Sequence, residues 1–116
     1  MSDGECLFCR IASRRIPAQI VAEDEELIAF NDIKPQAPVH LLIIPKAHVP
    51  TLADATPAHT MLLGRAQQFA NRLAQEQGLV PQGYRLVVNC GPQAGQTVFH
   101  LHWHLLGGRT MRWPPG

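Results

Sequence analysis

Three histidines occupy alternate positions near the end of the sequence, in the segment FHLHWHLL at residues 99–106. Successive side chains of a β-strand point to opposite faces, so a strand over 98–106 places His100, His102 and His104 on one face. The opposite face is apolar and can pack against a helix; it carries Phe99, Leu101, Trp103 and Leu105. Half of the six histidines in the chain lie within five residues, and this clustering indicates a functional site.

Two kinds of chemistry fit this pattern. Imidazole is a common ligand of Zn²⁺, and two histidines two residues apart can reach one ion, although a catalytic zinc site also needs a third ligand and an open position for water. Alternatively, a neutral imidazole attacks a phosphorus atom and forms a covalent intermediate that water resolves. Neighbouring histidines would then fix the tautomer of the nucleophile and protonate the leaving group.

A strand with these histidines needs neighbouring strands to position it. Residues 39–44 form a continuous apolar run between Pro38 and Pro45, a pattern typical of a central strand with both faces buried. The apolar stretches 20–22 and 27–31 flank the acidic residues 23–26 and predict a hairpin. Residues 84–89 predict a further strand, and the Gly- and Pro-containing stretch 89–95 predicts a loop.

Two helices are expected. The longer spans 57–77, because Thr56 can cap its start, Pro57 suits the first position and Gly78 can close its end. Its apolar side chains fall on one stripe, formed by Leu62, Ala66, Phe69, Ala70 and Leu73. A shorter helix is expected over 5–15, ending before Pro17. The order helix, hairpin, strand, helix, hairpin predicts an α+β fold with mostly antiparallel strands.

The composition predicts a single globular domain over residues 1–116, with a tail over 107–116. The chain is 46% hydrophobic and 16% charged, with a formal net charge of +1, which points neither to nucleic acid nor to a membrane as a partner. Its apolar runs are too short to span a bilayer. The acidic start at residues 1–5 does not resemble a signal peptide. Three cysteines, an odd number, argue against a disulfide framework and favour the cytoplasm.

The histidine segment resembles the His-x-His-x-His-x-x signature of the histidine-triad (HIT) superfamily, with apolar residues at x. Further segments resemble the nucleotide-binding Hint branch of that superfamily: FNDIKPQAPVH at 30–40, IIPK at 43–46, GYRL at 83–86, GQTV at 95–98, LGGR at 106–109 and WPPG at 113–116. The resemblance implies a five-stranded antiparallel sheet with two helices, paired with a second copy into a ten-stranded sheet. It also implies a purine nucleoside phosphoramidase that releases AMP or GMP and an amine.

The resemblance implies catalytic roles for five residues. His102 attacks the α-phosphorus and forms a nucleotidyl-histidine. His104 and Thr97 lie near the leaving group, where Thr97 stands in place of the serine usual in this branch. His100 orients the site and His40 completes the polar cluster. No cofactor is needed for this chemistry.

Further residues are implied to bind the nucleotide. Asn89 and the Gly95 backbone donate to the phosphate, and Asp32 accepts hydrogen bonds from the ribose hydroxyls. The base lies between apolar walls formed by Ile33, Phe30 and Leu42. Trp113 in the tail shapes the leaving-group pocket across the dimer. The residues alone leave plainer interpretations open: Asp32 as a turn residue, the apolar residues and His40 as core, and Trp113 as part of a disordered tail.

Cys6 and Cys9 form a C-x₂-C pair, which is half of a zinc site. The resemblance implies a structural zinc with His48 as third ligand and His100 as fourth, and this ion would tie the N-terminal helix to the sheet. The alternative is that the cysteines are two small buried apolar residues. Cys90 has no evident partner and is expected to be exposed.

Two other functions compete with the phosphoramidase. One is a binding module that holds AMP without turnover, although binding alone would not require the complete histidine set and Thr97. The other is a zinc-dependent hydrolase that uses the histidine strand directly. A related branch cleaves dinucleoside polyphosphates, and the LGGR and WPPG segments favour the phosphoramidase over it. Expected substrates are AMP or GMP phosphoramidates and aminoacyl-adenylates.

Overall fold

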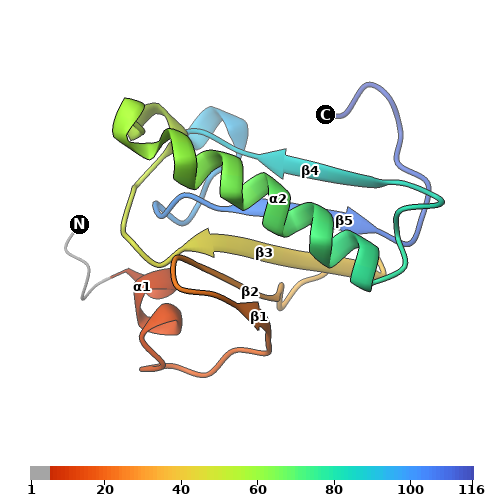
Figure 1. Cartoon of the computed structure of the whole chain (residues 1–116). Coiled ribbons are helices and arrows are strands. Elements are labelled where there is room, and N and C mark those ends of the chain that lie inside the picture. Colours follow the sequence, from red (N-terminus) through yellow and green to blue (C-terminus); the bar gives the residue numbers. More distant parts are fainter. Residues whose placement is uncertain (1–5) are drawn as a thin grey trace.

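The computed structural model describes residues 6–116, in which five strands form one antiparallel sheet in the order β1-β2-β3-β5-β4 (Figure 1). The strands are β1 (Ile20–Glu23), β2 (Leu27–Asn31), β3 (Val39–Pro45), β4 (Tyr84–Val88) and β5 (Trp103–Gly107). The α-helices are α1 (Leu7–Ala12) and α2 (Thr60–Glu76). The predicted α+β class, with a five-stranded antiparallel sheet and two helices, is confirmed.

Only the second half of the histidine segment pairs with neighbouring strands. β5 begins at Trp103, whereas the sequence predicts a strand over 98–106. Pro45, at the end of the neighbouring β3, has no N–H to continue the ladder, and its carbonyl accepts a hydrogen bond from the His100 ring at 2.7 Å. The Leu101 amide donates instead to the Val49 carbonyl at 2.7 Å. The predicted strand is therefore too long at its start.

The alternation of the segment nevertheless persists. Leu101, Trp103 and Leu105 enter the core under α2, as predicted, while His100 and His102 are buried on the other side, against the Phe8 ring. Phe99 is only half-buried and lies outside that core. The sheet thus separates an apolar face from a face that carries the histidines.

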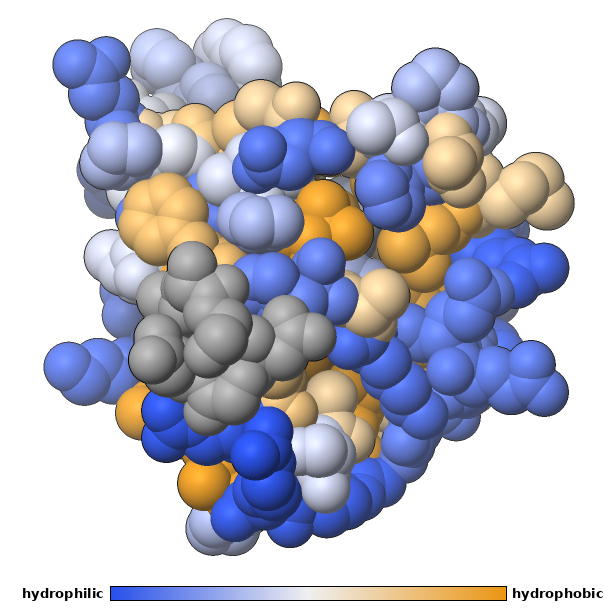
Figure 2. Space-filling view, turned by 90° about the vertical axis from the view of Figure 1, so that its left-hand side faces the viewer, coloured by the Kyte–Doolittle hydropathy of each residue, from blue (hydrophilic) through white to orange (hydrophobic). Residues whose placement is uncertain are grey.

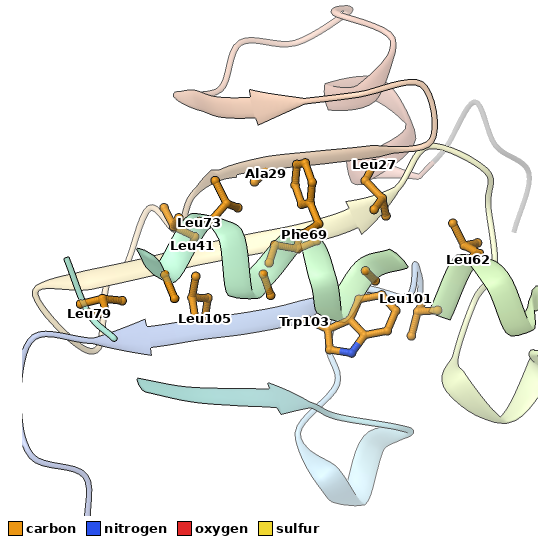
Figure 3. Close-up of a cluster of buried hydrophobic side chains, with 14 of the residues drawn as sticks. Leu27, Ala29, Leu41, Leu62, Phe69, Leu73, Leu79, Leu101, Trp103 and Leu105 are labelled. Carbon is orange, nitrogen blue, oxygen red and sulfur yellow. The ribbon is translucent and has the colours of Figure 1, made fainter. Parts of the chain in front are cut away.

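The helix α2 covers the apolar face of the sheet (Figure 3). All five predicted stripe residues of α2 are buried, and they pack against side chains of β2, β3 and β5, which include Leu27, Leu41, Ile43 and Leu105. Burial of a large apolar side chain contributes roughly 1.5–3 kcal/mol. This core fixes β3 and β5 side by side, and the histidines on their opposite face are placed by it.

The bounds of α2 follow from its ends. The predicted span 57–77 begins with a 3-10 turn, Pro57–His59, and the α-helix proper starts at Thr60. Thr56 caps this start, with its amide donating to His59 Nδ1 at 2.9 Å. At the other end Gly78 has φ of +73° and the Leu79 amide donates to the Ala74 carbonyl at 2.8 Å, which is the Schellman arrangement that glycine favours.

The helix α1 is shorter than the predicted 5–15 and ends at Ala12, before Arg14 turns the chain with φ of +64°. It packs on the histidine face, where Phe8 and Ile11 form a second core with side chains of β2 and β3, including Phe30 and Leu42. Residue 5 of the predicted helix and the N-terminal stretch 1–5, interpreted above as unlike a signal peptide, lie outside the described residues.

The described residues contain no helix long and apolar enough to cross a membrane. On the face shown in Figure 2, hydrophobic residues are interspersed with hydrophilic ones. The predicted hairpin is confirmed as β1 and β2, and the strands predicted over 39–44 and 84–89 are confirmed as β3 and β4.

Candidate active site

Three of the predicted catalytic histidines meet on the sheet face opposite α2. His104 comes from β5, His40 from the neighbouring β3, and His102 directly precedes β5. The ring centroids of His102 and His104 are 5.0 Å apart, and those of His40 and His104 are 5.2 Å apart. The pairing of β3 with β5 therefore assembles this cluster, to which His40 contributes from more than sixty residues away along the chain.

His102 carries its proton on the nitrogen that faces the backbone. Its Nδ1 lies 2.8 Å from the His100 carbonyl oxygen, and because a carbonyl can only accept, Nδ1 must donate. The Nε2 atom of the neutral ring then keeps a free lone pair. Burial lowers the pKa of His102 from its ordinary value, against the opposing effects of the hydrogen bond to the His100 backbone and of the Asp32 charge. The ring is therefore neutral near pH 7.

His40 and His104 form a directed chain of hydrogen bonds. The Gln36 amide donates to His40 Nδ1 at 3.0 Å, so the proton of a neutral His40 ring is on Nε2. That Nε2 lies 2.9 Å from His104 Nδ1 and donates to it. The proton of neutral His104 consequently sits on its own Nε2, which is free to donate onward.

The pKa of His104 is lowered to about 4. Burial is the largest cause, the charges of His102 and His40 act in the same direction, and Asp32 opposes them. Near pH 7 this histidine is neutral in the free protein. It can act as a hydrogen-bond donor, and it gains a second proton only if an anion binds beside it.

Asp32 stands at the edge of this cluster and has two roles in the structure. One carboxylate oxygen accepts from the Lys34 amide at 2.8 Å, so the interpretation as a turn residue is correct for that oxygen. The other lies 3.4 Å from His40 Nε2. Asp32 also lines the adjoining pocket, where it can accept from a ligand hydroxyl.

The adjoining pocket has a volume of about 700 Å³. All four residues predicted for the sugar and base contribute to it: Phe30, Asp32, Ile33 and Leu42. Ile33 is 93% exposed and forms part of the rim rather than of a core. The pocket is thus a hollow with apolar walls and one carboxylate, which suits a flat aromatic base attached to a sugar.

The opposite wall of this pocket comes from α1 and the chain after it, which the sequence analysis did not assign to the site. Leu7, Phe8 and Ile11 line it, together with residues 16–19. The spacing of these three residues places them on one side of a helix, and this apolar stripe was the signal available in the sequence. It is short because it lies in a helix of only six residues.

The loop after β4 carries Asn89 and Gly95, which are predicted to contact phosphate, and Thr97, which is predicted to lie near the leaving group. Asn89 is half-buried and Thr97 exposed, and Gly95 has φ of +93°, which glycine adopts readily. Gln96, only 3% exposed, accepts from the Gly91 amide at 2.8 Å and donates to the Pro50 carbonyl at 2.9 Å. This side chain holds the loop in shape, a role that the sequence did not reveal.

The structure does not bring Trp113 to the pocket within one chain. Its side chain is 83% exposed, and it does not line the hollow beside the histidines. The tail is held to the sheet by Arg85, which donates to the Arg112 carbonyl at 2.8 Å. A contribution of Trp113 across a dimer stays a prediction. Cys90 is exposed, as predicted.

The four predicted zinc ligands Cys6, Cys9, His48 and His100 converge beneath α1. Cys6 Sγ lies 3.3 Å from His100 Nδ1, Cys9 Sγ lies 3.3 Å from His48 Nδ1, and the two Nδ1 atoms are 3.2 Å apart. A tetrahedral zinc with ordinary bond lengths separates such ligand atoms by roughly 3.3–3.8 Å. The donor set and its spacing therefore fit Zn²⁺.

A second hydrogen bond of His100 supports this assignment. Its Nε2 lies 2.7 Å from the Pro45 carbonyl and must donate to it, so the proton of a neutral ring is on Nε2. The lone pair of Nδ1 then faces the sulfurs of Cys6 and Cys9. Metal-binding histidines usually donate their other ring N–H to such a partner. His100 is fully buried, and its ring faces the two cysteine sulfurs as a metal ligand would.

Asp32, His40 and His104 form another group with metal-ligand spacing, but their hydrogen bonds favour protons over a metal. The Gln36 amide occupies His40 Nδ1, which leaves the proton on the Nε2 atom that would have to bind the ion. The outer hydrogen bonds of the histidines thus leave different ring nitrogens available in the two clusters. This difference disfavours the expectation of a zinc ion bound directly by the catalytic histidines.

Comparison with known proteins gives a consistent result. The model of the HIT domain family matches residues 13–111. The crystal structure of a HIT family hydrolase from Legionella pneumophila Philadelphia 1 superposes with a TM-score of 0.95 at 54% identity, over 97% of this chain and 100% of that one.

Two plant proteins are also similar. Adenylylsulfatase HINT1 of Arabidopsis thaliana is 46% identical over 99% of this chain and 79% of its own length. The 14 kDa zinc-binding protein of Zea mays is 47% identical over 100% of this chain and 91% of its own.

Proposed function

The chain belongs to the HIT domain family, and on that premise we propose that it hydrolyses purine nucleoside phosphoramidates to AMP or GMP and an amine. The resemblance to the HIT superfamily and its Hint branch is confirmed by the family match and the relatives. At the coarser level the chain is a HIT family hydrolase. The phosphoramidase reaction is our proposal.

One observation carries the proposal most directly: the hydrogen bond from His102 Nδ1 to the His100 carbonyl. It leaves Nε2 as the lone-pair atom of a neutral ring, and such an atom attacks an anionic phosphorus centre without charge repulsion. The new bond joins Nε2 to the α-phosphorus while the phosphorus–nitrogen bond breaks. The product is a nucleotidyl-His102 intermediate.

His104 is proposed to deliver the proton that the leaving amine needs. Its Nε2–H points away from His40 and is the only ring proton not used within the chain of hydrogen bonds. The phosphate of a bound substrate opposes the effects that lower the pKa of His104, and so favours a protonated ring in the complex. Water then attacks the intermediate, returns a proton to His104, and releases the nucleotide from His102.

The remaining predicted residues receive binding roles in this proposal. Asp32 accepts from the ribose hydroxyls and the walls of the pocket hold the base. Asn89 and the Gly95 backbone donate to the phosphate, and Thr97 lies near the leaving group. Cys6, Cys9, His48 and His100 hold a structural Zn²⁺, which supports the sheet and takes no part in the reaction. The zinc-binding relative from Zea mays supports this part.

The test is a steady-state assay with a fluorogenic adenosine 5′-phosphoramidate. His102→Asn should reduce kcat/KM by at least about 10³-fold, since it removes the nucleophile on which the covalent route depends. His59→Gln is the matched control, because His59 caps α2 at an exposed site and glutamine suits a capping position. Turnover by a folded His102→Asn protein at the wild-type rate would exclude the proposal.

A second assay distinguishes related reactions. The name of the Arabidopsis relative, Adenylylsulfatase HINT1, makes adenylyl sulfate the natural competing substrate, because it shares the adenylyl group and differs in the leaving group. We expect the phosphoramidate to be the better substrate. AMP binding without hydrolysis of either compound would favour the binding module.

A further inference from the structure

The helix α1 has only six residues, and a helix of that length does not form by itself in water. Two sets of contacts hold it in place. Phe8 and Ile11 pack against the sheet, and the side chains of Cys6 and Cys9 join the cluster with His48 and His100. The position of α1 therefore depends on both the apolar contacts and the cysteines.

The residues between the two cysteines belong to the nucleotide pocket. Leu7 and Phe8 line it. The same short turn of chain therefore directs its cysteine sulfurs toward His48 and His100 and its apolar side chains toward the pocket. The centroid of the Phe8 ring lies 5.5 Å from that of Phe30, which forms another wall of the pocket, and 5.1 Å from that of His102. Phe8 is thus the contact between the cluster, the base pocket and the nucleophile.

We infer that Cys6, Cys9 and His48 are positioning residues for nucleotide binding: with Zn²⁺ bound they hold α1 so that Phe8 and Leu7 complete the base pocket. This inference rests on the proposed function for the identity of the ligand. The residues do not touch the nucleotide, and they act through the two side chains that lie between the cysteines. Loss of the metal should therefore weaken nucleotide binding.

The chemistry of the cluster explains why the ion matters to α1. Two sulfurs and two ring nitrogens direct lone pairs at one point, with the nearest ligand atoms 3.2–3.4 Å apart. A cation makes this arrangement favourable, whereas lone pairs facing one another without it repel. Without the ion, we expect these groups to move apart, and the cysteines lie at the start of α1 and within it, a helix of only six residues.

The first experiment measures AMP binding by calorimetry on the full chain, with zinc content determined in the same samples. We expect removal of zinc by a chelator to raise the Kd for AMP on the order of tenfold, the factor that about 1.4 kcal/mol of lost apolar contact produces. Zinc added back should restore it. Cys6→Ser should behave like the stripped protein, and Cys90→Ser, which changes an exposed thiol outside the cluster, should behave like wild type.

A double-mutant cycle tests whether the effect passes through Phe8. Phe8→Leu should raise the Kd for AMP in the zinc-loaded protein, with zinc content unchanged. In the stripped protein the same substitution should have a much smaller effect, because Phe8 is no longer held against the pocket. The use of stripped wild-type protein keeps the test valid even if Cys6→Ser does not fold.

The outcomes separate this inference from the proposed function. Two results would overturn the positioning role and leave the phosphoramidase proposal intact. One is a Kd for AMP that does not change when zinc is removed, and the other is additive effects of zinc removal and Phe8→Leu on that Kd. Failure of the zinc-loaded protein to bind AMP would overturn both. If the protein binds AMP in a zinc-dependent way but does not hydrolyse the phosphoramidate, only the phosphoramidase proposal is overturned.

Discussion

At the residue scale, outer hydrogen bonds decide what each histidine can do. The His100 carbonyl sets the tautomer of His102, and the Gln36 amide sets that of His40, which in turn sets His104. The carbonyl of Pro45 directs His100 toward the cysteines. In the proposed function, one residue type therefore supplies a nucleophile, a proton donor and a metal ligand within a few residues of sequence.

Burial of neutral histidines makes the stability of the protein depend on pH. The pKa of His104 falls from 6.5 to about 4 on folding, so between these values the unfolded chain binds more protons than the folded one. The free energy of unfolding should then fall as the pH is lowered from about 6.5 to about 4. His40 and His102, whose pKa values are also lowered by burial, act in the same direction.

Urea denaturation across this pH range checks the prediction. His104→Asn removes one titrating group, so its stability should fall less steeply with acidification than that of wild type. Loss of zinc in acid affects both proteins and does not enter the difference. Identical slopes for the two proteins would contradict the lowered pKa of His104.

At the scale of elements, the sheet separates two layers of packed side chains. The helix α2 packs on one face with the main core, and α1 packs on the other with the pocket and the metal cluster. β3 and β5 contribute side chains to both faces by alternation. A change on the α2 face therefore alters stability without direct contact with the site.

Two glycines on that side form a matched pair for a stability prediction. A Cβ at Gly107 would lie 2.6 Å from Leu79, a buried residue, so Gly107→Ala should destabilise the protein by about 1–3 kcal/mol through overpacking. A Cβ at Gly64, within α2, meets nothing within 4 Å, so Gly64→Ala should stabilise it by roughly 0.5–1 kcal/mol.

Chemical denaturation of both variants measures these changes. Substitution of the same residue type by alanine should thus act in opposite directions at the two sites. A neutral Gly107→Ala would show that Leu79 repacks without cost, and a destabilising Gly64→Ala would show that the exposed face of α2 is in contact with something else in solution.

At the scale of the whole molecule, β4 forms one edge of the sheet. An open edge offers unpaired backbone groups to another chain, and its residues from Arg85 to Val88 are half-buried. These features are consistent with the homodimer that the resemblance implies, and we propose that two copies of β4 join the sheets into one of ten strands. The tail with the exposed Trp113 would then lie free to reach the partner.

Light scattering at several concentrations tests the dimer. We expect a mass twice that of one chain over the micromolar range, because joining two sheets along β4 pairs the open backbone groups of that edge. A Trp113→Ala variant should remain dimeric and change the preference among leaving amines if the tail shapes the neighbouring site. A single-chain mass at all concentrations would refute the proposed pairing.

The sequence by itself determined the strands, the long helix and the list of reactive residues, because these depend on local patterns. Alternation placed His102 and His104 on one face, and the apolar run at 39–44 predicted the central strand. The C-x₂-C spacing indicated a metal site. The start of β5 was predicted wrongly, because the missing ladder bond at Pro45 depends on a strand far away in sequence.

Only the tertiary structure decided how these residues are used. The tautomer of each histidine follows from partners such as Gln36 and Pro45 that no local pattern connects to it. The pocket wall from α1 and the supporting role of Gln96 likewise depend on contacts between distant segments. Sequence periodicity records which face a side chain takes, whereas the direction of a hydrogen bond is set by the atoms that folding brings beside it.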